Sequence, residues 1–217
     1  MNVLYLDPLI RQYQQIKRQL PEFHSQLLDT IKPATLLAAA RKLGLAKRNT
    51  LYLPNEIREY LLYDFLLYAW PDKSNNPIFQ TRIAGFEDMQ PSLHLNTLSV
   101  FEMRGMGNGR VSCQDIFTED EPFEAVDLTL SKEAGLRLLI MRTVEFPDFI
   151  SFTGVGLPVH TEDLYKAILR GAERLFVKFN ADTLYDLDEA QTTEFEAMLI
   201  TTGLRHKADE LLHVGEV

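Results

Sequence analysis

The chain has 217 residues, of which 46% are hydrophobic and 24% charged, a globular composition that excludes a disordered or fibrous chain. The single cysteine, Cys113, excludes an intrachain disulfide and a cysteine zinc cage, and it suits a cytoplasmic location. The net charge is −9, although residues 1–60 carry nine Lys and Arg against five Asp and Glu, and this acidic majority disfavours general binding of nucleic acid.

Helices are predicted for the amino-terminal third. Asp7 followed by Pro8 is a typical helix start, because aspartate caps the first amide groups and proline fits the first turn. Apolar residues then recur at helical spacing until Pro21, where we expect an interruption. A second, short helix is predicted over residues 22–31 and a third over residues 34–43.

The strongest helical pattern covers residues 54–70, where apolar side chains surround most of the helix and predict a place at the centre of the core. Asp64 interrupts this pattern, and we expect a tyrosine or a distant arginine to pair with it, since an unpaired buried charge is costly. The apolar run is too short to span a bilayer, so no membrane partner is expected. A further helix is predicted from residue 76 to 85.

Between residues 98 and 159 the pattern changes to short β-branched and aromatic runs separated by turn residues. Five strands are expected, and they predict a small antiparallel barrel-like sheet, because a chain of hairpins either closes or leaves an exposed edge. Asn108-Gly109 is the clearest hairpin turn. The expected strands cover residues 99–104, 110–117, 123–130, 136–146 and 149–159.

Helices return after the strands. Thr161 is expected to cap one helix, a second is expected from Asp188 to Thr202 with Gly203 as its end, and a short one over residues 207–213. The predicted fold class is therefore α+β, with N-terminal helices, a central small antiparallel β-barrel-like module and C-terminal helices. We expect three regions: residues 1–97 helical, residues 98–159 as the β module, and residues 160–217 as helices packing on the rest.

Four residues form a candidate pocket between the β module and the helix at 54–70: Asp64, Tyr68, Asp115 and Arg142. A carboxylate within an apolar helix is either paired for structure or used for chemistry. Structural pairing is favoured, because an isolated acid on a core helix more often fixes packing than transfers protons.

A basic cluster lies between two predicted helices and consists of Arg41, Lys42, Lys47 and Arg48. A helix, a turn with a glycine and a second helix superficially resemble a DNA-binding helix-turn-helix motif. The connection is too wide for a tight turn, and the following helix is too apolar to lie in a groove. We therefore favour a solvated loop.

No catalytic, cofactor-binding or metal-ligating residues are predicted. The glycine-rich residues 105–109 are expected to form a hairpin turn, because a strand rather than a helix follows them. The five histidines lack metal-ligand spacing, and the acidic runs lack a calcium-loop pattern. Cys113 is expected to be a small buried side chain, with a nucleophilic role left open.

The residues between Glu59 and about Pro158 contain a series of features whose order can be compared with other proteins. They are a helix with Tyr60, Asp64, Phe65 and Trp70, a helix at Pro77, Phe101-Glu102, a glycine turn, residues 114–117, and a later strand with Arg142. This order resembles a group of uncharacterised bacterial proteins that often carry a SEC-C zinc module. The cysteine-rich module is absent, so no metal or adaptor role is carried over. The resemblance implies a small β-barrel beside helices and no established activity.

These patterns favour a cytoplasmic, non-catalytic binding or scaffold protein that uses the β module to contact a protein or peptide. An enzyme of unrecognised type, with a pocket of acids and tyrosines, is the alternative. Nucleic-acid binding through the basic N-terminal face is weaker. No cofactor is expected, a homodimer is left open, and the sequence does not specify the partner, substrate or pathway.

Overall fold

The computed structural model describes residues 7–71, 78, 86, 96–132 and 137–211. Helices and a β-sheet occupy separate stretches of the chain, which confirms the α+β class. The helix expected over residues 76–85 lies, apart from Ile78, outside the described residues. The helices are α1 (Pro8–Asp29), α2 (Pro33–Lys42), α3 (Glu56–Tyr68), α4 (Glu162–Phe179) and α5 (Glu189–Arg205), with short 3-10 turns η3 (Leu130–Lys132), η4 (Leu184–Asp186) and η5 (Ala208–Leu211).

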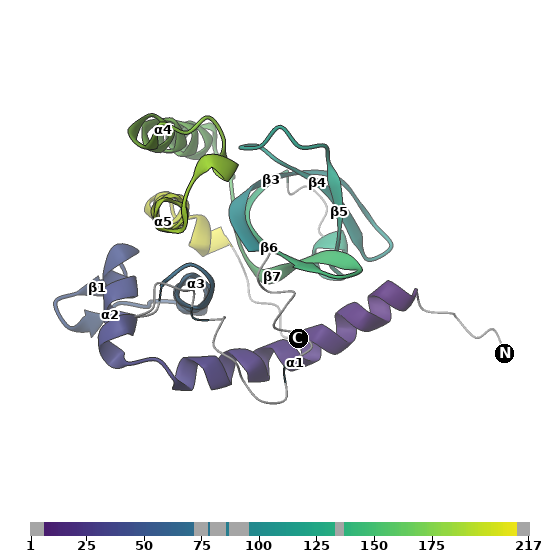
Figure 1. Cartoon of the computed structure of the whole chain (residues 1–217), viewed down its shortest axis with the longest axis horizontal. Coiled ribbons are helices and arrows are strands. Elements are labelled where there is room, and N and C mark those ends of the chain that lie inside the picture. Colours follow the sequence, from purple (N-terminus) through teal and green to yellow (C-terminus); the bar gives the residue numbers. More distant parts are fainter. Residues whose placement is uncertain (1–6, 72–77, 79–85, 87–95, 133–136, 212–217) are drawn as a thin grey trace.

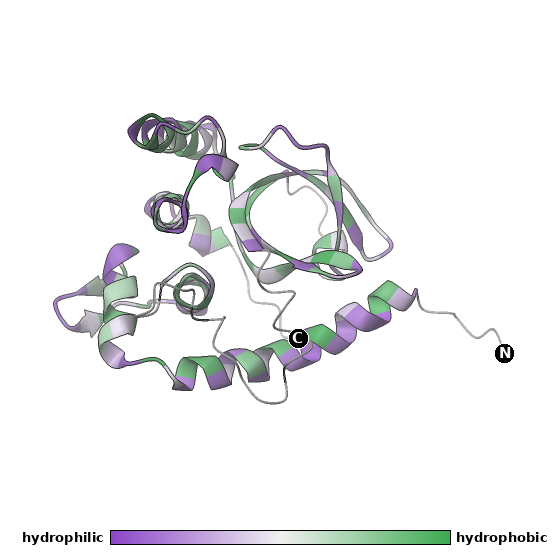
Figure 2. Ribbon diagram, in the orientation of Figure 1, coloured by the Kyte–Doolittle hydropathy of each residue, from purple (hydrophilic) through white to green (hydrophobic). Residues whose placement is uncertain are grey.

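α1 is one continuous helix, so the interruption expected at Pro21 is wrong, and the short helix expected over residues 22–31 is its second half. Leu20, Phe23 and Leu27 are buried on both sides of Pro21, which is itself exposed. The burial of these side chains keeps the two halves of α1 in line. Its stabilisation exceeds the stability lost because proline has no amide hydrogen to donate. Hydrophilic and hydrophobic residues both occur along α1, as expected of a surface helix (Figure 2).

α3 is the central core helix that the sequence predicts. Asn55 caps it by accepting a hydrogen bond from the backbone amide of Arg58, and eight of its residues are buried. A two-stranded hairpin, β1 (Ala46–Lys47) and β2 (Thr50–Leu51), separates it from α2. Burial around most of the helix explains why its apolar residues follow no single stripe.

Five strands form one sheet whose pairing closes on itself: β3 (Asn96–Gly107), β4 (Arg110–Asp115), β5 (Phe123–Val126), β7 (Phe149–Pro158) and β6 (Leu138–Phe146), which pairs again with β3. We call it the closed sheet. The pairing is not wholly antiparallel as expected, because β5 and β7 run parallel and meet at Ala125 and Ile150. Asn108 and Gly109 form the predicted turn, with φ of 53° and 79°.

The closed sheet has an apolar interior, and part of its outer face packs on the helices through apolar residues. Alternate residues of each strand point inward or outward. The interior is filled by side chains that form one cluster: Phe101, Met103, Val111, Cys113, Ala125, Leu139, Met141 and Phe152. The outer face of β3, β6 and β7 contributes Val100, Ile140 and Leu157 to a second cluster shared with the helices. The closed sheet and the helices therefore share this second cluster.

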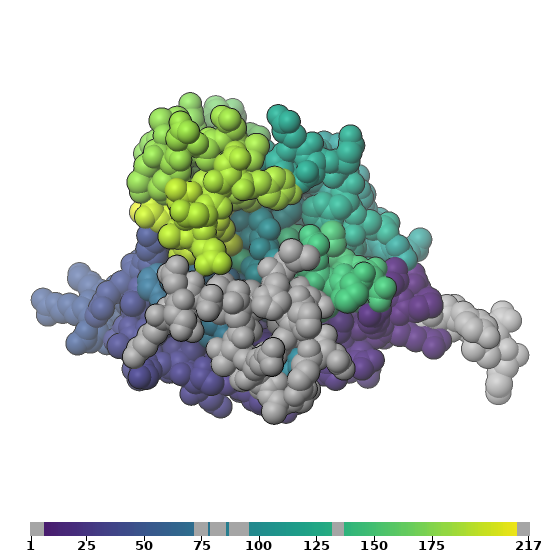
Figure 3. Space-filling model, in the orientation of Figure 1, coloured from purple at the N-terminus to yellow at the C-terminus, as the bar shows by residue number. Residues whose placement is uncertain are grey.

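Figure 1 shows α3, α4 and α5 on one side of the closed sheet, with α1 running past it. In the space-filling view (Figure 3), the yellow-green C-terminal helices lie beside the teal and green strands, and the purple α1 lies below the strands. The helix that we expected to end at Gly203 continues to Arg205. A Cβ on Gly203 would lie 2.6 Å from Leu157 Cδ1, so this glycine allows α5 to approach β7 instead of ending the helix.

Gly109 and Gly107 provide a matched test of the hairpin. Gly109→Ala should lower the free energy of unfolding by about 2 kcal/mol, because its φ is positive and a Cβ would lie 2.8 Å from Leu128 Cδ2 and 3.1 Å from Ile10 Cδ1. Gly107→Ala meets no atom within 4 Å and should change stability much less. Urea unfolding of both variants measures the difference, and equal losses would contradict this turn geometry.

Candidate functional site

A buried ion cluster centred on Arg142 joins the closed sheet to two helices. Arg142 Nε donates to Asp64 Oδ1 of α3 at 2.8 Å, while Nη1 and Nη2 donate to the two carboxylate oxygens of Glu196 on α5 at 2.9 and 2.7 Å. Nη1 also donates to Asn96 Oδ1 of β3 at 2.7 Å. Arg142 is 0% exposed, Asp64 8% and Glu196 2%. We call these four residues the Arg142 cluster.

The strand pattern explains why Arg142 points toward the helices. It lies two residues after Ile140 and two before Val144 on β6, and both of these belong to the core shared with the helices. Residues two apart on a strand share a face. The planar guanidinium can then donate in several directions at once, which suits it to link two helices and a neighbouring strand.

The Arg142 cluster holds two carboxylates and one guanidinium. Burial disfavours the charge on Arg142, but the charges of Asp64 and Glu196 outweigh burial and raise its pKa above the ordinary value. The backbone amide of Leu98 donates to Glu196 Oε1 at 3.3 Å, whereas Asp64 Oδ2 has no hydrogen-bond partner among the described residues. Arg142 is therefore a permanent cation that holds the carboxylates in place.

Tyr68 and His24 extend the polar contacts from the Arg142 cluster to α1. The guanidinium carbon of Arg142 lies 5.4 Å from the centre of the Tyr68 ring, and the Tyr68 hydroxyl is hydrogen-bonded to His24 Nε2 at 2.8 Å. Burial, followed by the charge of Asp64, raises the pKa of Tyr68. Burial lowers the pKa of His24 to about 4, so the imidazole is neutral at pH 7.

Three of the four residues of the candidate pocket lie together, and the fourth has other partners. Arg142 contacts both Asp64 and Tyr68, and the charge of Asp64 raises the pKa of Tyr68. Asp115 instead accepts hydrogen bonds from the Ser99 hydroxyl at 2.7 Å and from a backbone amide at 2.8 Å. Burial raises the pKa of Asp115 despite these bonds. The sequence predicted a tyrosine or a distant arginine as the partner of Asp64, and in the structure Arg142 is the hydrogen-bond donor.

The four residues of the basic cluster are all exposed. Arg41 donates to the backbone carbonyl of Arg48 at 2.7 Å and to Asn49 Oδ1 at 2.9 Å. These bonds attach the end of α2 to the β1–β2 turn, where Arg48 has a positive φ of 56°. Arg41 thus has a local structural role, and Lys42 and Lys47 are exposed on the surface.

Cys113 is buried inside the closed sheet, as expected. Burial, with a smaller effect from the charge of Asp115, raises the pKa of its thiol to about 12. Only the thiolate is a strong nucleophile, so this environment disfavours the nucleophilic role that the sequence left open.

Three residues that contact Arg142 or Tyr68 were not predicted from the sequence: Glu196, Asn96 and His24. Glu196 lies four residues before Ile200 and seven before Gly203, on the side of α5 that packs against the core. A carboxylate at helical spacing from apolar residues is the same signal that identified Asp64. The sequence around Asn96 and His24 carries no comparable signal.

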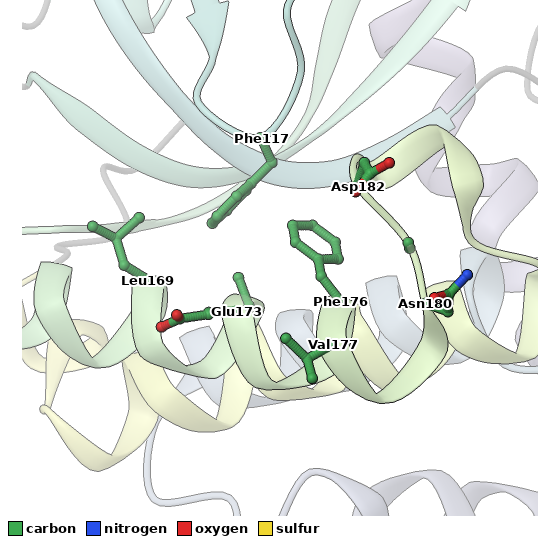
Figure 4. A pocket seen from close by; sticks show the side chains of 9 residues that line it. Phe117, Leu169, Glu173, Phe176, Val177, Asn180 and Asp182 are labelled. Atoms are coloured by element: carbon green, nitrogen blue, oxygen red, sulfur yellow. The ribbon is translucent and has the colours of Figure 1, made fainter.

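A second feature is a hollow of about 560 Å³ between α4 and Phe117, which follows β4. We call it the apolar groove. In Figure 4 the Phe117 and Phe176 rings border the space above α4, and Leu169 and Val177 lie along the helix below. Val177 is 78% exposed and Leu169 38%. The groove is lined by Phe117, Leu169, Ala172, Glu173, Phe176, Val177, Asn180, Ala181 and Asp182.

The described residues form neither a metal-binding cluster nor a membrane-spanning helix. No group of three or more His, Cys, Asp or Glu side chains in them could hold a metal ion. None of the helices they form is both long and apolar enough to cross a bilayer.

The chain was compared with known proteins. The model of a family of unknown function, DUF7986, matches residues 7–186, which is most of the chain. This match agrees with the expectation of an uncharacterised protein, but it does not show a SEC-C module. Neither the curated proteins nor the solved structures contain a match.

Replacement of Arg142 tests the structural role of the Arg142 cluster. Arg142→Met should lower the free energy of unfolding by about 3–5 kcal/mol, because Asp64 and Glu196 would remain buried without a counter-charge. Arg104→Met removes an exposed ion pair with Glu102 and should cost less than about 1 kcal/mol. Chemical denaturation of both variants measures these losses, and a small loss for Arg142→Met would contradict the role.

Acid should destabilise the protein through His24. The pKa of His24 is about 4 in the folded chain and near 6.5 in the unfolded chain, so the unfolded state binds more protons between these values. Stability should therefore fall as the pH drops from 6.5 to 4, by up to about 3 kcal/mol. His24→Gln should remove this part of the loss, and His160→Gln, at an exposed position, should keep it. Denaturation curves measured across this pH range would contradict the prediction if wild type and His24→Gln lost the same amount.

Proposed function

The chain belongs to this family of unknown function, and we propose that it is a non-catalytic binding protein whose apolar groove holds an apolar segment of a partner protein or peptide. The supporting observation is the exposure of Val177 and Leu169, which lie eight residues apart along α4 and border the same hollow. Exposed apolar side chains gathered around a concave surface are typical of interaction sites.

The aromatic walls of the apolar groove support a preformed site. Phe117 meets Phe176 edge-on, with ring centres 6.2 Å apart, and Phe176 stacks on Phe195 at 5.7 Å and 10°. Phe195 is fully buried, so it anchors this group of rings in the core. Walls that are already ordered lose little conformational freedom when a partner binds, which favours affinity.

In this proposal the β module contacts the partner in the apolar groove and not along the edge of a strand. Strand addition requires an unpaired edge, and closure of the sheet gives each of the five strands two neighbours, with β5 and β7 joined at Ala125 and Ile150. Phe117, two residues after the end of β4, supplies one wall of the groove. A partner held there would touch both the β module and the C-terminal helices.

The enzymatic alternative stays a hypothesis, and three observations weigh against it. Asp64 and Arg142 bind each other and are buried. Asp115 is hydrogen-bonded away from them, to Ser99. The Cys113 thiol has a raised pKa. A cytoplasmic location, a bacterial source and a homodimer also stay predictions.

Peptides selected from a random phage-displayed library provide a direct test. Peptides enriched on the wild-type protein should contain apolar residues, and Val177→Asp should weaken their binding by roughly tenfold or more, because a carboxylate would face the buried apolar contact. Titration of a fluorescent copy of an enriched peptide measures both dissociation constants.

Tyr52→Asp is the matched control. Tyr52 is 65% exposed and is not among the residues that line the groove, so its substitution adds the same charge elsewhere and should leave binding unchanged. If no peptide is enriched, or if Val177→Asp binds as well as wild type, the groove does not have this function.

A further inference from the structure

A second hollow, of about 530 Å³, lies beside α4 on the side of the end of α5. We call it the arginine groove. It shares only Glu173 with the apolar groove, so the two hollows flank the exposed side of α4. It is lined by Ala167, Arg170, Glu173, Arg174, Thr202, Arg205 and His206.

Close packing of the two helices brings these arginines together. A Cβ on Gly171 would lie 2.5 Å from Met198 Sδ, so α4 and α5 approach closely at this point. Arg170 and Arg174 are one turn apart on α4, and Arg205 is the last residue of α5. Cations four residues apart on a helix repel one another, so this arrangement costs stability unless an anion lies between them.

The arginines differ from the lysines nearby in their partners. Lys166, Lys178 and Lys207 each form an ion pair with a glutamate. Arg170, Arg174 and Arg205 are exposed and form no ion pair with any carboxylate in the described part of the chain. Three such arginines around one hollow concentrate positive charge in a protein whose net charge is −9.

The hydrogen bonds leave donors available for a ligand. Arg174 Nε donates to the backbone carbonyl of Arg170 at 3.1 Å, which fixes the stem of Arg174 along the helix. Within the described residues its Nη groups have no protein acceptor. With Glu173 included, the lining carries a charge of about +2 when His206 is neutral.

We propose that the arginine groove binds a small ligand that carries two or more phosphate groups. Each guanidinium can donate two hydrogen bonds to the oxygens of one phosphate group. Several arginines together can neutralise a ligand with several negative charges, whereas a ligand with a single carboxylate would leave them partly unpaired. The volume fits a small molecule. The acidic remainder of the protein would repel a long phosphate backbone, so nucleic acid is the less favoured occupant. This inference goes beyond the proposed protein-binding function and uses a different surface.

Calorimetric titration of the full chain with inorganic pyrophosphate, at about 150 mM NaCl, tests the proposal. Wild type should bind pyrophosphate saturably, and Arg170→Gln/Arg205→Gln should weaken the binding at least tenfold. Arg104→Gln, which changes an exposed arginine on β3, should leave it within twofold. Because Arg170 and Arg205 are both exposed, the double variant should fold, and the two single variants give the same comparison if it does not.

Three results would overturn the proposal. The first is the absence of saturable binding by wild type. The second is an equal loss of affinity in Arg104→Gln, which would indicate a general effect of charge. The third is tighter binding of a single-stranded oligonucleotide than of pyrophosphate, with affinity falling steeply as salt is raised, which would assign the groove to nucleic acid.

Discussion

The ion pairs of Arg142 are the interaction on which the rest of the structure depends. A buried guanidinium is tolerated only where carboxylates surround it, and here they come from α3 and α5. Asp64, Arg142 and Glu196 belong to the three regions that the sequence divides at residues 97 and 159. That division stays a prediction, and we propose that the three regions fold as one unit because none of these charges is satisfied without the others.

The two grooves are consequences of this arrangement. Glu196 fixes α5 against the closed sheet, and Gly203 allows the helix to approach Leu157. α4 then packs on α5 at Gly171, which sets the apolar groove on one flank of α4 and the arginine groove on the other. The buried polar residues therefore position the surfaces that we propose for binding, although they do not themselves contact a ligand.

Local sequence patterns predicted much of this fold, and the predictions that were wrong have physical causes. The turn at Asn108-Gly109 followed from residues that tolerate positive φ. The third strand was expected to reach residue 130 but ends at Val126, because Asp127 Oδ1 accepts the amides of Thr129 and Leu130 and turns the chain. The parallel pairing of β5 with β7 depends on closure of the sheet, which no local pattern encodes. For the candidate site, Asp64 was visible as a lone charge in an apolar helix, whereas its partners come from distant parts of the chain.

Native-state hydrogen exchange measures most directly whether the Arg142 cluster unites the three regions. The slowest amides of α3, β6 and α5 should exchange with one common free energy, equal to that of global unfolding, because opening any one of them exposes a charge buried in the others. Exchange of α5 at a distinctly lower free energy, while α3 and β6 stay protected, would show that the C-terminal helices open independently and would contradict a single cooperative unit.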